Sequence, residues 1–138
     1  MKALFQIAQK NNIIVEYCRL PKNESISTPE IGDGAIMMDY SMLFSKTQER
    51  VHLAHELGHC MRGAFYNAYS GLDIRGRHEY RANKWAVHQL IPLAKIKKAM
   101  RSGYTEAWQL AEYFDVTEDF IRTAIQIYDT ENLSWRDE

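Results

Sequence analysis

Five consecutive residues, His55-Glu56-Leu57-Gly58-His59, constrain this chain more than any other part of its sequence. On a helix, two histidines four residues apart lie on one face about one turn from each other, so their imidazoles can converge on one metal ion. Glu56 lies one step round from His55, where its carboxylate can take a proton from metal-activated water without binding the ion. The stretch therefore predicts a helix that carries two metal ligands and a general base, as in a metal-dependent hydrolase.

The bulk properties are those of an ordinary globular protein. The 138 residues are 46% apolar and 25% charged, which predicts a single domain over residues 1–138. A formal net charge of -1 provides no overall attraction to nucleic acid or to an anionic membrane. No apolar run approaches the roughly 20 residues of a membrane span, and the first residues lack the features of a signal peptide. We therefore expect a cytoplasmic protein that has no membrane association, and in which Cys18 and Cys60 form no disulfide.

Apolar periodicity and turn residues predict an α+β fold. Strands are expected at residues 13–17 and 35–40, with a loop over 20–34 between them. Helices are expected at residues 2–10, 48–61, 79–90, 93–101, 105–114 and 117–128, and residues 62–78, which contain three glycines, look irregular. This order predicts a small antiparallel sheet on one side of a mostly helical body. The predicted catalytic core spans about 13–92, a C-terminal helical part spans 93–128, and 129–138 form a loose tail in which Leu133 and Trp135 could dock.

The two histidines need a third ligand, because a catalytic zinc ion usually has three protein ligands and one open position. Glu79 is the best candidate, since it is predicted to begin a helix twenty residues after His59, beyond a glycine-containing connection that can turn the chain back. Asn83 follows four residues later on the same face. Its amide could accept a hydrogen bond from the free ring nitrogen of a liganding histidine, which would fix the aim of that ring.

A metal-dependent hydrolase that attacks a carbonyl group also needs a hydrogen-bond donor for the oxyanion that forms during attack. Tyr69, His78 and Tyr80 are candidates by their proximity in sequence to the ligands, with no choice among them. His52 lies about 20° from the direction of His59 on the helical wheel, so it could reach the mouth of the pocket. A hydrogen-bonded structural histidine is the preferred interpretation of His52.

Two motifs at this spacing resemble the ImmA/IrrE family of metallopeptidases. The first is His55–His59 with its preceding Arg50–Ala54, which is similar to the family's R-F-t-l-A-H-E-L-G-H. The second is Glu79–Ala86 followed by Leu90-Ile91-Pro92, which is similar to E-x-x-A-N-x-F-A ending in L-hydrophobic-P, with Trp85 in place of the usual Phe. The resemblance covers roughly residues 13–92, and the pair of motifs is far more specific than a lone His-Glu-x-x-His.

The resemblance implies a gluzincin-like metallopeptidase in which a three-stranded sheet packs on the active-site helices. It implies that His55, His59 and Glu79 bind one zinc ion per chain and that Glu56 is the catalytic base, although another divalent metal such as Mn²⁺ could take the place of zinc. Members commonly cleave a helix-turn-helix repressor of a mobile element, a prophage or a stress regulon, which is therefore the expected substrate and partner. A strand edge at Ala35–Asp39 is expected to hold the substrate in extended form by backbone pairing.

Two other functions compete with this one. Residues 110–122 resemble the turn of a helix-turn-helix, which would suit a DNA-binding or protein-interaction regulator. The second helix begins with Glu118-Asp119 and offers only Arg122 and Gln126 as donors, so direct nucleic-acid binding is not expected. A metal-binding toxin or regulator without proteolysis is the other alternative. The intact Glu56 argues against it, because a purely structural metal site does not need that carboxylate and usually has four closed ligands, often cysteines.

Overall fold

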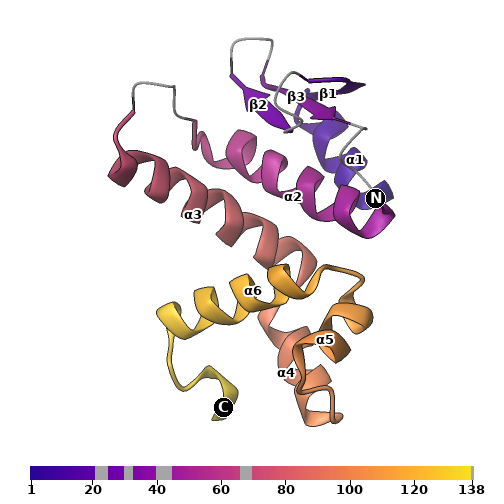
Figure 1. The fold of residues 1–138 in the computed structure, drawn as a ribbon, viewed down its shortest axis with the longest axis vertical. Helices are drawn as coiled ribbons and strands as arrows, with labels where there is room; N and C mark the ends of the chain where they lie inside the picture. Colours follow the sequence, from indigo (N-terminus) through magenta and orange to yellow (C-terminus); the bar gives the residue numbers. More distant parts are fainter. Residues whose placement is uncertain (21–24, 30–32, 40–44, 66–69, 138) are drawn as a thin grey trace. The chain divides into compact units, whose positions relative to one another are not determined.

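The computed structural model describes residues 1–20, 25–29, 33–39, 45–65 and 70–137 of the chain. Within those ranges the elements follow one another in the order shown in Figure 1: α1 (Lys2–Lys10), β1 (Ile14–Cys18), β2 (Ile26–Thr28), β3 (Ala35–Asp39), α2 (Lys46–Arg62), α3 (Leu72–Leu90), α4 (Leu93–Arg101), α5 (Ala107–Phe114), α6 (Glu118–Glu131) and the short 3-10 helix η1 (Trp135–Asp137). The α+β class and the small three-stranded sheet are confirmed. None of the helices in the described ranges combines the length and apolar character needed to cross a membrane.

The sheet is mixed, so the prediction of an antiparallel sheet was wrong. Its strand order is β1-β3-β2: β1 runs parallel to β3, with Ile14 opposite Ala35, and β2 runs antiparallel to β3, with Ser27 opposite Ile36. The central strand β3 is almost wholly buried, and Ile36 and Met38 have no exposed surface. Since β3 has a neighbour on each side, it offers no free edge to a substrate, and β2 is an outer strand of the sheet.

Strand β2 falls inside the region 20–34 that the sequence predicted to be a loop. It is three residues long, and its sequence Ile-Ser-Thr contains too little apolar alternation to stand out. Its backbone is ordered by pairing with β3, a tertiary contact that the local sequence does not encode.

Helix α2 begins and ends with well-defined caps. The Ser45 hydroxyl accepts a hydrogen bond from the Gln48 backbone N–H at 3.1 Å, and Gly63 ends the helix in the left-handed conformation that glycine adopts without strain. Helix α3 differs from its prediction, because it begins at Leu72 and contains seven residues that were expected to be irregular. Glu79 therefore lies inside a helix, in its third turn, and does not begin one.

The two helices approach closely at Gly58. A Cβ atom added to this glycine would lie 2.3 Å from the backbone oxygen of Ala82, which is far inside van der Waals contact. Only a residue without a side chain lets the backbone of α3 pack directly on α2 at this point. Figure 1 shows α2 between the sheet and α3 in this part of the chain. Leu53 and Leu57 of α2 and Ala82 of α3 have no exposed surface.

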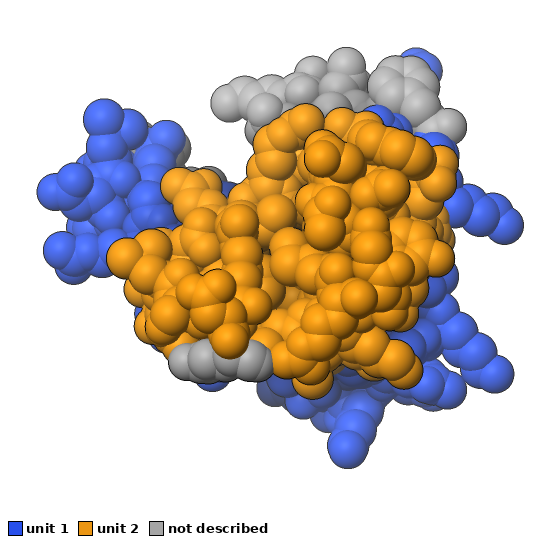
Figure 2. All heavy atoms as spheres, turned by 90° about the horizontal axis from the view of Figure 1, so that it is seen from below, with its two compact units in different colours: residues 1–86 blue, residues 87–138 orange. Residues whose placement is uncertain are grey.

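The chain divides into two compact units, Met1–Ala86 and Val87–Glu138, which Figure 2 shows in different colours. The second unit contains the last turn of α3 and the helices α4, α5 and α6. In its core, the Tyr128 hydroxyl donates a hydrogen bond of 2.7 Å to the Ile91 backbone oxygen. The tail differs from the expected loose segment, because α6 continues to Glu131 and Trp135 is buried against Tyr128, at 5.6 Å between ring centroids. Whether 1–138 acts as one domain stays a prediction.

Candidate metal centre

Three side chains from α2 and α3 converge at one point. Glu79 Oε2 lies 3.0 Å from His55 Nε2, and Glu79 Oε1 lies 3.1 Å from His59 Nε2. The two Nε2 atoms are themselves 3.1 Å apart, with their rings nearly perpendicular. One ligand atom from each residue therefore fits within a span of 4.8 Å.

This arrangement suits a small divalent cation. In a tetrahedral zinc site with bonds of about 2.0–2.1 Å, neighbouring ligand atoms are about 3.4 Å apart. The spacings of 3.0–3.1 Å between the three residues are only a few tenths of an ångström shorter. Two imidazole nitrogens and a carboxylate oxygen are also the donor types that zinc prefers in catalytic sites. The side chains of His55, His59 and Glu79 therefore fit a metal that has three protein ligands.

The other ring nitrogen of each histidine has its own partner. His55 Nδ1 lies 2.7 Å from the Asn83 side-chain oxygen, and His59 Nδ1 lies 2.5 Å from the Ala64 backbone oxygen. Because both partners are acceptors, each Nδ1 carries the proton and donates it, so the Nε2 lone pair of each ring is the one that would bind a cation. Asn83 lies where the sequence predicted a supporting amide. The contact with the Ala64 backbone oxygen was not predicted, because every residue type has a backbone carbonyl and the sequence does not show which one lies near His59.

Glu56 lies beside the three converging side chains and is buried, with 7% of its surface exposed. Burial raises the pKa of its carboxyl group, and the nearby His55 together with a hydrogen bond from Ser27 opposes that rise. For His55, burial lowers the pKa of the imidazole, but the hydrogen bond with Glu79 and the charges of Glu56 and Glu79 outweigh it, so the pKa is raised. A divalent cation at this point would supply the positive charge that these two carboxylates attract.

The site opens into a cleft of about 410 Å³. Its walls come from β2, α2, α3 and the segment after α2, and its lining residues are Ser25, Ile26, Ser27, His52, His55, Glu56, His59, Ala64, Phe65 and Glu79. Ser27 and Phe65 were missed by the sequence analysis, and their place in the cleft depends on the strand pairing of β2 and on the end of α2 at Gly63. His52 does reach this cleft, and burial and then the charge of His55 lower its pKa.

Among the described residues, two of the three expected oxyanion donors, His78 and Tyr80, do not line this cleft. His78 and Tyr80 line a separate hollow on α3 together with Ile74, Arg77 and Arg81, and neither appears in the lining of the metal cleft. The physical reason is that neighbouring positions on a helix point about 100° apart, so residues next to Glu79 in sequence face other directions. Tyr69 lies outside the described residues.

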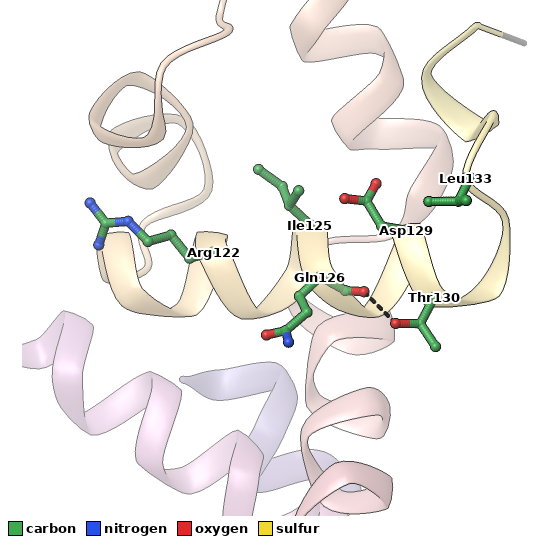
Figure 3. A pocket seen from close by; sticks show the side chains of 6 residues that line it. All are labelled: Arg122, Ile125, Gln126, Asp129, Thr130 and Leu133. Carbon is green, nitrogen blue, oxygen red and sulfur yellow. Dashed lines mark hydrogen bonds between the residues drawn. The ribbon is translucent and has the colours of Figure 1, made fainter.

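A larger hollow, of about 540 Å³, lies along α6 and the residues after it (Figure 3). It is lined by Arg122, Ile125, Gln126, Asp129, Thr130 and Leu133, and Figure 3 shows the Thr130 hydroxyl donating to the Gln126 backbone oxygen. Its cationic group, Arg122, is paired with Asp119 at 3.0 Å and with Glu118 at 3.3 Å. Its carboxylate, Asp129, accepts a hydrogen bond from Trp135 Nε1 at 2.8 Å, so the charged groups among these lining residues already have partners within the protein.

The three converging donor groups and the adjacent carboxylate of Glu56 are the residue types found in metal-dependent hydrolases. The sequence model of a peptidase family described as "IrrE N-terminal-like domain" matches residues 34–126, which is well over half of the chain. The chain belongs to this family and is a metallopeptidase. The match extends beyond residue 92 through α4 and α5 into α6, so it also includes most of the second unit. Comparisons with curated proteins and with solved structures found no match.

Proposed function

We propose that this metallopeptidase is a zinc-dependent endopeptidase in which His55, His59 and Glu79 bind the metal and Glu56 is the general base. The observation that carries this proposal is the convergence of the three donor atoms within 4.8 Å, beside the buried carboxylate of Glu56. Such a set of three ligands and one flanking carboxylate matches the requirements of metal-assisted peptide hydrolysis.

The residues of the chain have separate tasks in this reaction. A bound divalent cation would acidify water and polarise the scissile carbonyl. The Glu56 carboxylate accepts the proton of the attacking water and passes it to the leaving nitrogen. The Ser27 hydroxyl donates a hydrogen bond to Glu56 and so restricts its carboxylate, while Asn83 and the Ala64 carbonyl hold the imidazole rings in position.

The outer strand β2 takes the role in substrate binding that was predicted for β3. Ile26 and Ser27 of β2 line the cleft, and the pairing described for β2 is with β3 on one side. An extended peptide can therefore add to the other side of β2 by backbone hydrogen bonds and pass over the metal-binding residues. Ser27 belongs to β2 and its side chain is hydrogen-bonded to Glu56. A peptide paired with β2 would therefore bring its scissile bond next to Glu56.

The ligand roles can be tested by metal analysis. We expect about one zinc ion per chain in the purified protein, and its loss in His55→Ala or Glu79→Ala. Glu56→Gln is the matched control, because it should retain the ion and lose cleavage. Retention of the ion in both ligand variants would show that other residues bind it. If the protein contains manganese in place of zinc after expression in manganese-rich medium, the supply of each metal decides which one occupies the site.

We propose a helix-turn-helix repressor as the substrate and the cytoplasm as the site of action, on the basis of the resemblance to the ImmA/IrrE family. The test is co-expression of the wild-type protein, or of Glu56→Gln, with a helix-turn-helix regulator encoded nearby. The intact regulator should disappear only with the wild-type protein, and cleavage fragments should appear in its place. Equal survival of the regulator with both proteins would count against this substrate.

Direct binding to DNA is not part of the proposal. The second helix of the α5–α6 pair begins with Glu118 and Asp119, and both carboxylates pair with Arg122, the cation that would be needed to contact phosphates. We expect no shift of duplex DNA by the purified protein at low salt. A salt-dependent shift would instead favour a regulator that binds DNA through these helices.

A further inference from the structure

His52 is a polar side chain of the cleft that has no task in the metal site. It lies on α2 three residues before His55, is partly exposed, and is among the residues that line the cleft. Within the described part of the chain, its ring forms no hydrogen bond and no ion pair, whereas His55 and His59 each bond to a partner through Nδ1. A structural histidine would be expected to have such a partner, so the structure does not support that interpretation.

The position of His52 on the helix brings it close to a bound peptide but not to the metal. Its direction is about 20° from that of His59, so both side chains face the cleft, while three residues of helix separate it from His55 by about 4.5 Å of rise. It is not part of the group whose ligand atoms lie within 4.8 Å of one another. The rise from His52 to Glu56 is about 6 Å, and an extended chain advances about 3.4 Å per residue, so this offset corresponds to one or two residues of peptide from the bond over Glu56.

The surroundings of His52 give its ring a chemical preference. Three of the other lining residues, Ile26, Ala64 and Phe65, offer apolar surface, and the Ser27 hydroxyl is engaged with Glu56. An imidazole offers both an N–H donor and a nitrogen acceptor, so it can pair with a group that also donates and accepts, such as a hydroxyl or a primary amide. A substrate without such a group would displace water from the His52 ring and give it no new hydrogen-bond partner. The cleft would therefore bind that substrate less well.

We propose that His52 determines specificity by hydrogen-bonding a hydroxyl or amide side chain of the peptide substrate, one or two residues from the scissile bond. The inference rests on the proposed function, because it assumes that a peptide lies in the cleft beside Glu56. It assigns to His52 a role in substrate binding, with no role in binding the metal.

The test measures peptide binding without cleavage. Zinc-loaded Glu56→Gln is incubated with a randomised mixture of synthetic nonapeptides, and the retained peptides are sequenced by mass spectrometry. The same protein carrying His52→Leu, His52→Gln or His52→Ala is treated in parallel. We expect Glu56→Gln with His52 intact to enrich Ser, Thr, Asn and Gln about fivefold at one position, which is the effect of about one hydrogen bond. His52→Gln should retain the preference, His52→Leu should replace it with aliphatic residues, and His52→Ala should abolish it.

Each remaining outcome has a defined meaning. The same preference in all four proteins, or no retention of any peptide, would overturn the inference. Zinc content is measured alongside and should stay at about one ion per chain; loss of that ion in His52→Leu and His52→Ala would show a metal ligand and would also overturn it. If the wild-type protein cleaves none of these peptides while the binding preference still changes with His52, the inference stands and endopeptidase activity on such peptides is contradicted.

Discussion

Replacing Gly58 with alanine should separate α2 and α3, the two helices that carry the proposed metal ligands. The added Cβ atom would lie 2.3 Å from the Ala82 backbone oxygen and 2.9 Å from the carbonyl carbon and Cα of the same residue. An ordinary carbon–oxygen contact is about 3.3 Å, so α3 must move away from α2 by about 1 Å near this point. These atoms belong to backbone inside a helix, so no flexible side chain can relieve the contact.

The displacement can be converted into two measurable effects. Overpacking of this kind costs about 3 kcal/mol at the upper end of its usual range, and alanine offsets about 1 kcal/mol by its higher helix propensity, which leaves a net loss of about 2 kcal/mol. For a chain of this size, that loss lowers Tm by roughly 8 °C. The second effect is on metal affinity. The distances from the ion to its ligands must stay within about 0.2 Å of their normal values, and Glu79 moves with α3. We expect zinc affinity to fall by at least about tenfold.

The assay combines thermal unfolding of the metal-free protein with zinc titration against a competing chelator. Gly76→Ala is the matched control, because Gly76 lies on the same helix α3 and an added Cβ would meet nothing within 4 Å. Its Tm should rise slightly and its zinc affinity should equal that of the wild type. If Gly58→Ala unfolds at the wild-type temperature and binds zinc with wild-type affinity, the close approach at Ala82 does not hold the site together.

Three further predictions concern single side chains. Asn83→Ala removes the acceptor for His55 Nδ1 and should weaken zinc binding about tenfold to a hundredfold with little change in Tm, as measured by chelator competition; unchanged affinity would mean that the ring needs no such partner. Burial raises the pKa of the Cys60 thiol to about 11, so its alkylation by iodoacetamide in the folded protein should stay slow at pH 8 and accelerate only as pH approaches that value, or on unfolding. The same shift predicts that folded-state stability is constant below the ordinary thiol pKa and falls as pH rises above it, and rapid labelling at pH 8 would contradict both expectations. Tyr128→Phe removes the hydrogen bond to the Ile91 backbone oxygen and should lower the free energy of unfolding in urea by about 1–2 kcal/mol, whereas an unchanged midpoint would show that the oxygen finds another partner.

Local sequence signals were sufficient to predict α2 and the residues that converge on it. The spacing of His55 and His59 determines which face they share, and Ser45 is a strong cap at the predicted start. The start of α3 was not predicted, because Gly71 and Gly76 are ordinarily signs of irregular chain. A glycine on an exposed helix position costs only about 1 kcal/mol, so the helix forms despite Gly76.

The predictions of the substrate-binding strand and of the oxyanion donors failed for a common physical reason. Both features depend on how the elements pack in three dimensions, which the local sequence does not determine. The order β1-β3-β2 decides which strand has a free edge, and nothing in Ala35–Asp39 alone shows that two strands flank it. Likewise, His78 and Tyr80 are close to Glu79 in sequence but line a different hollow, because each lies about 100° from Glu79 around the axis of α3. The direction of His52 was predicted by the helical wheel, whereas its lack of a partner required coordinates.

The three proposed metal ligands come from two consecutive helices, α2 and α3, and this has a consequence for the order in which the molecule folds. His59 and Glu79 are only twenty residues apart, so closing the chain between them requires little loss of entropy. Contacts between near neighbours in sequence form early in folding, which makes the α2–α3 hairpin a natural first event. We expect a nascent chain to be able to capture its ion before residues 87–138 have been synthesised. The ion would then act as a cross-link that keeps the hairpin closed while the rest of the protein folds.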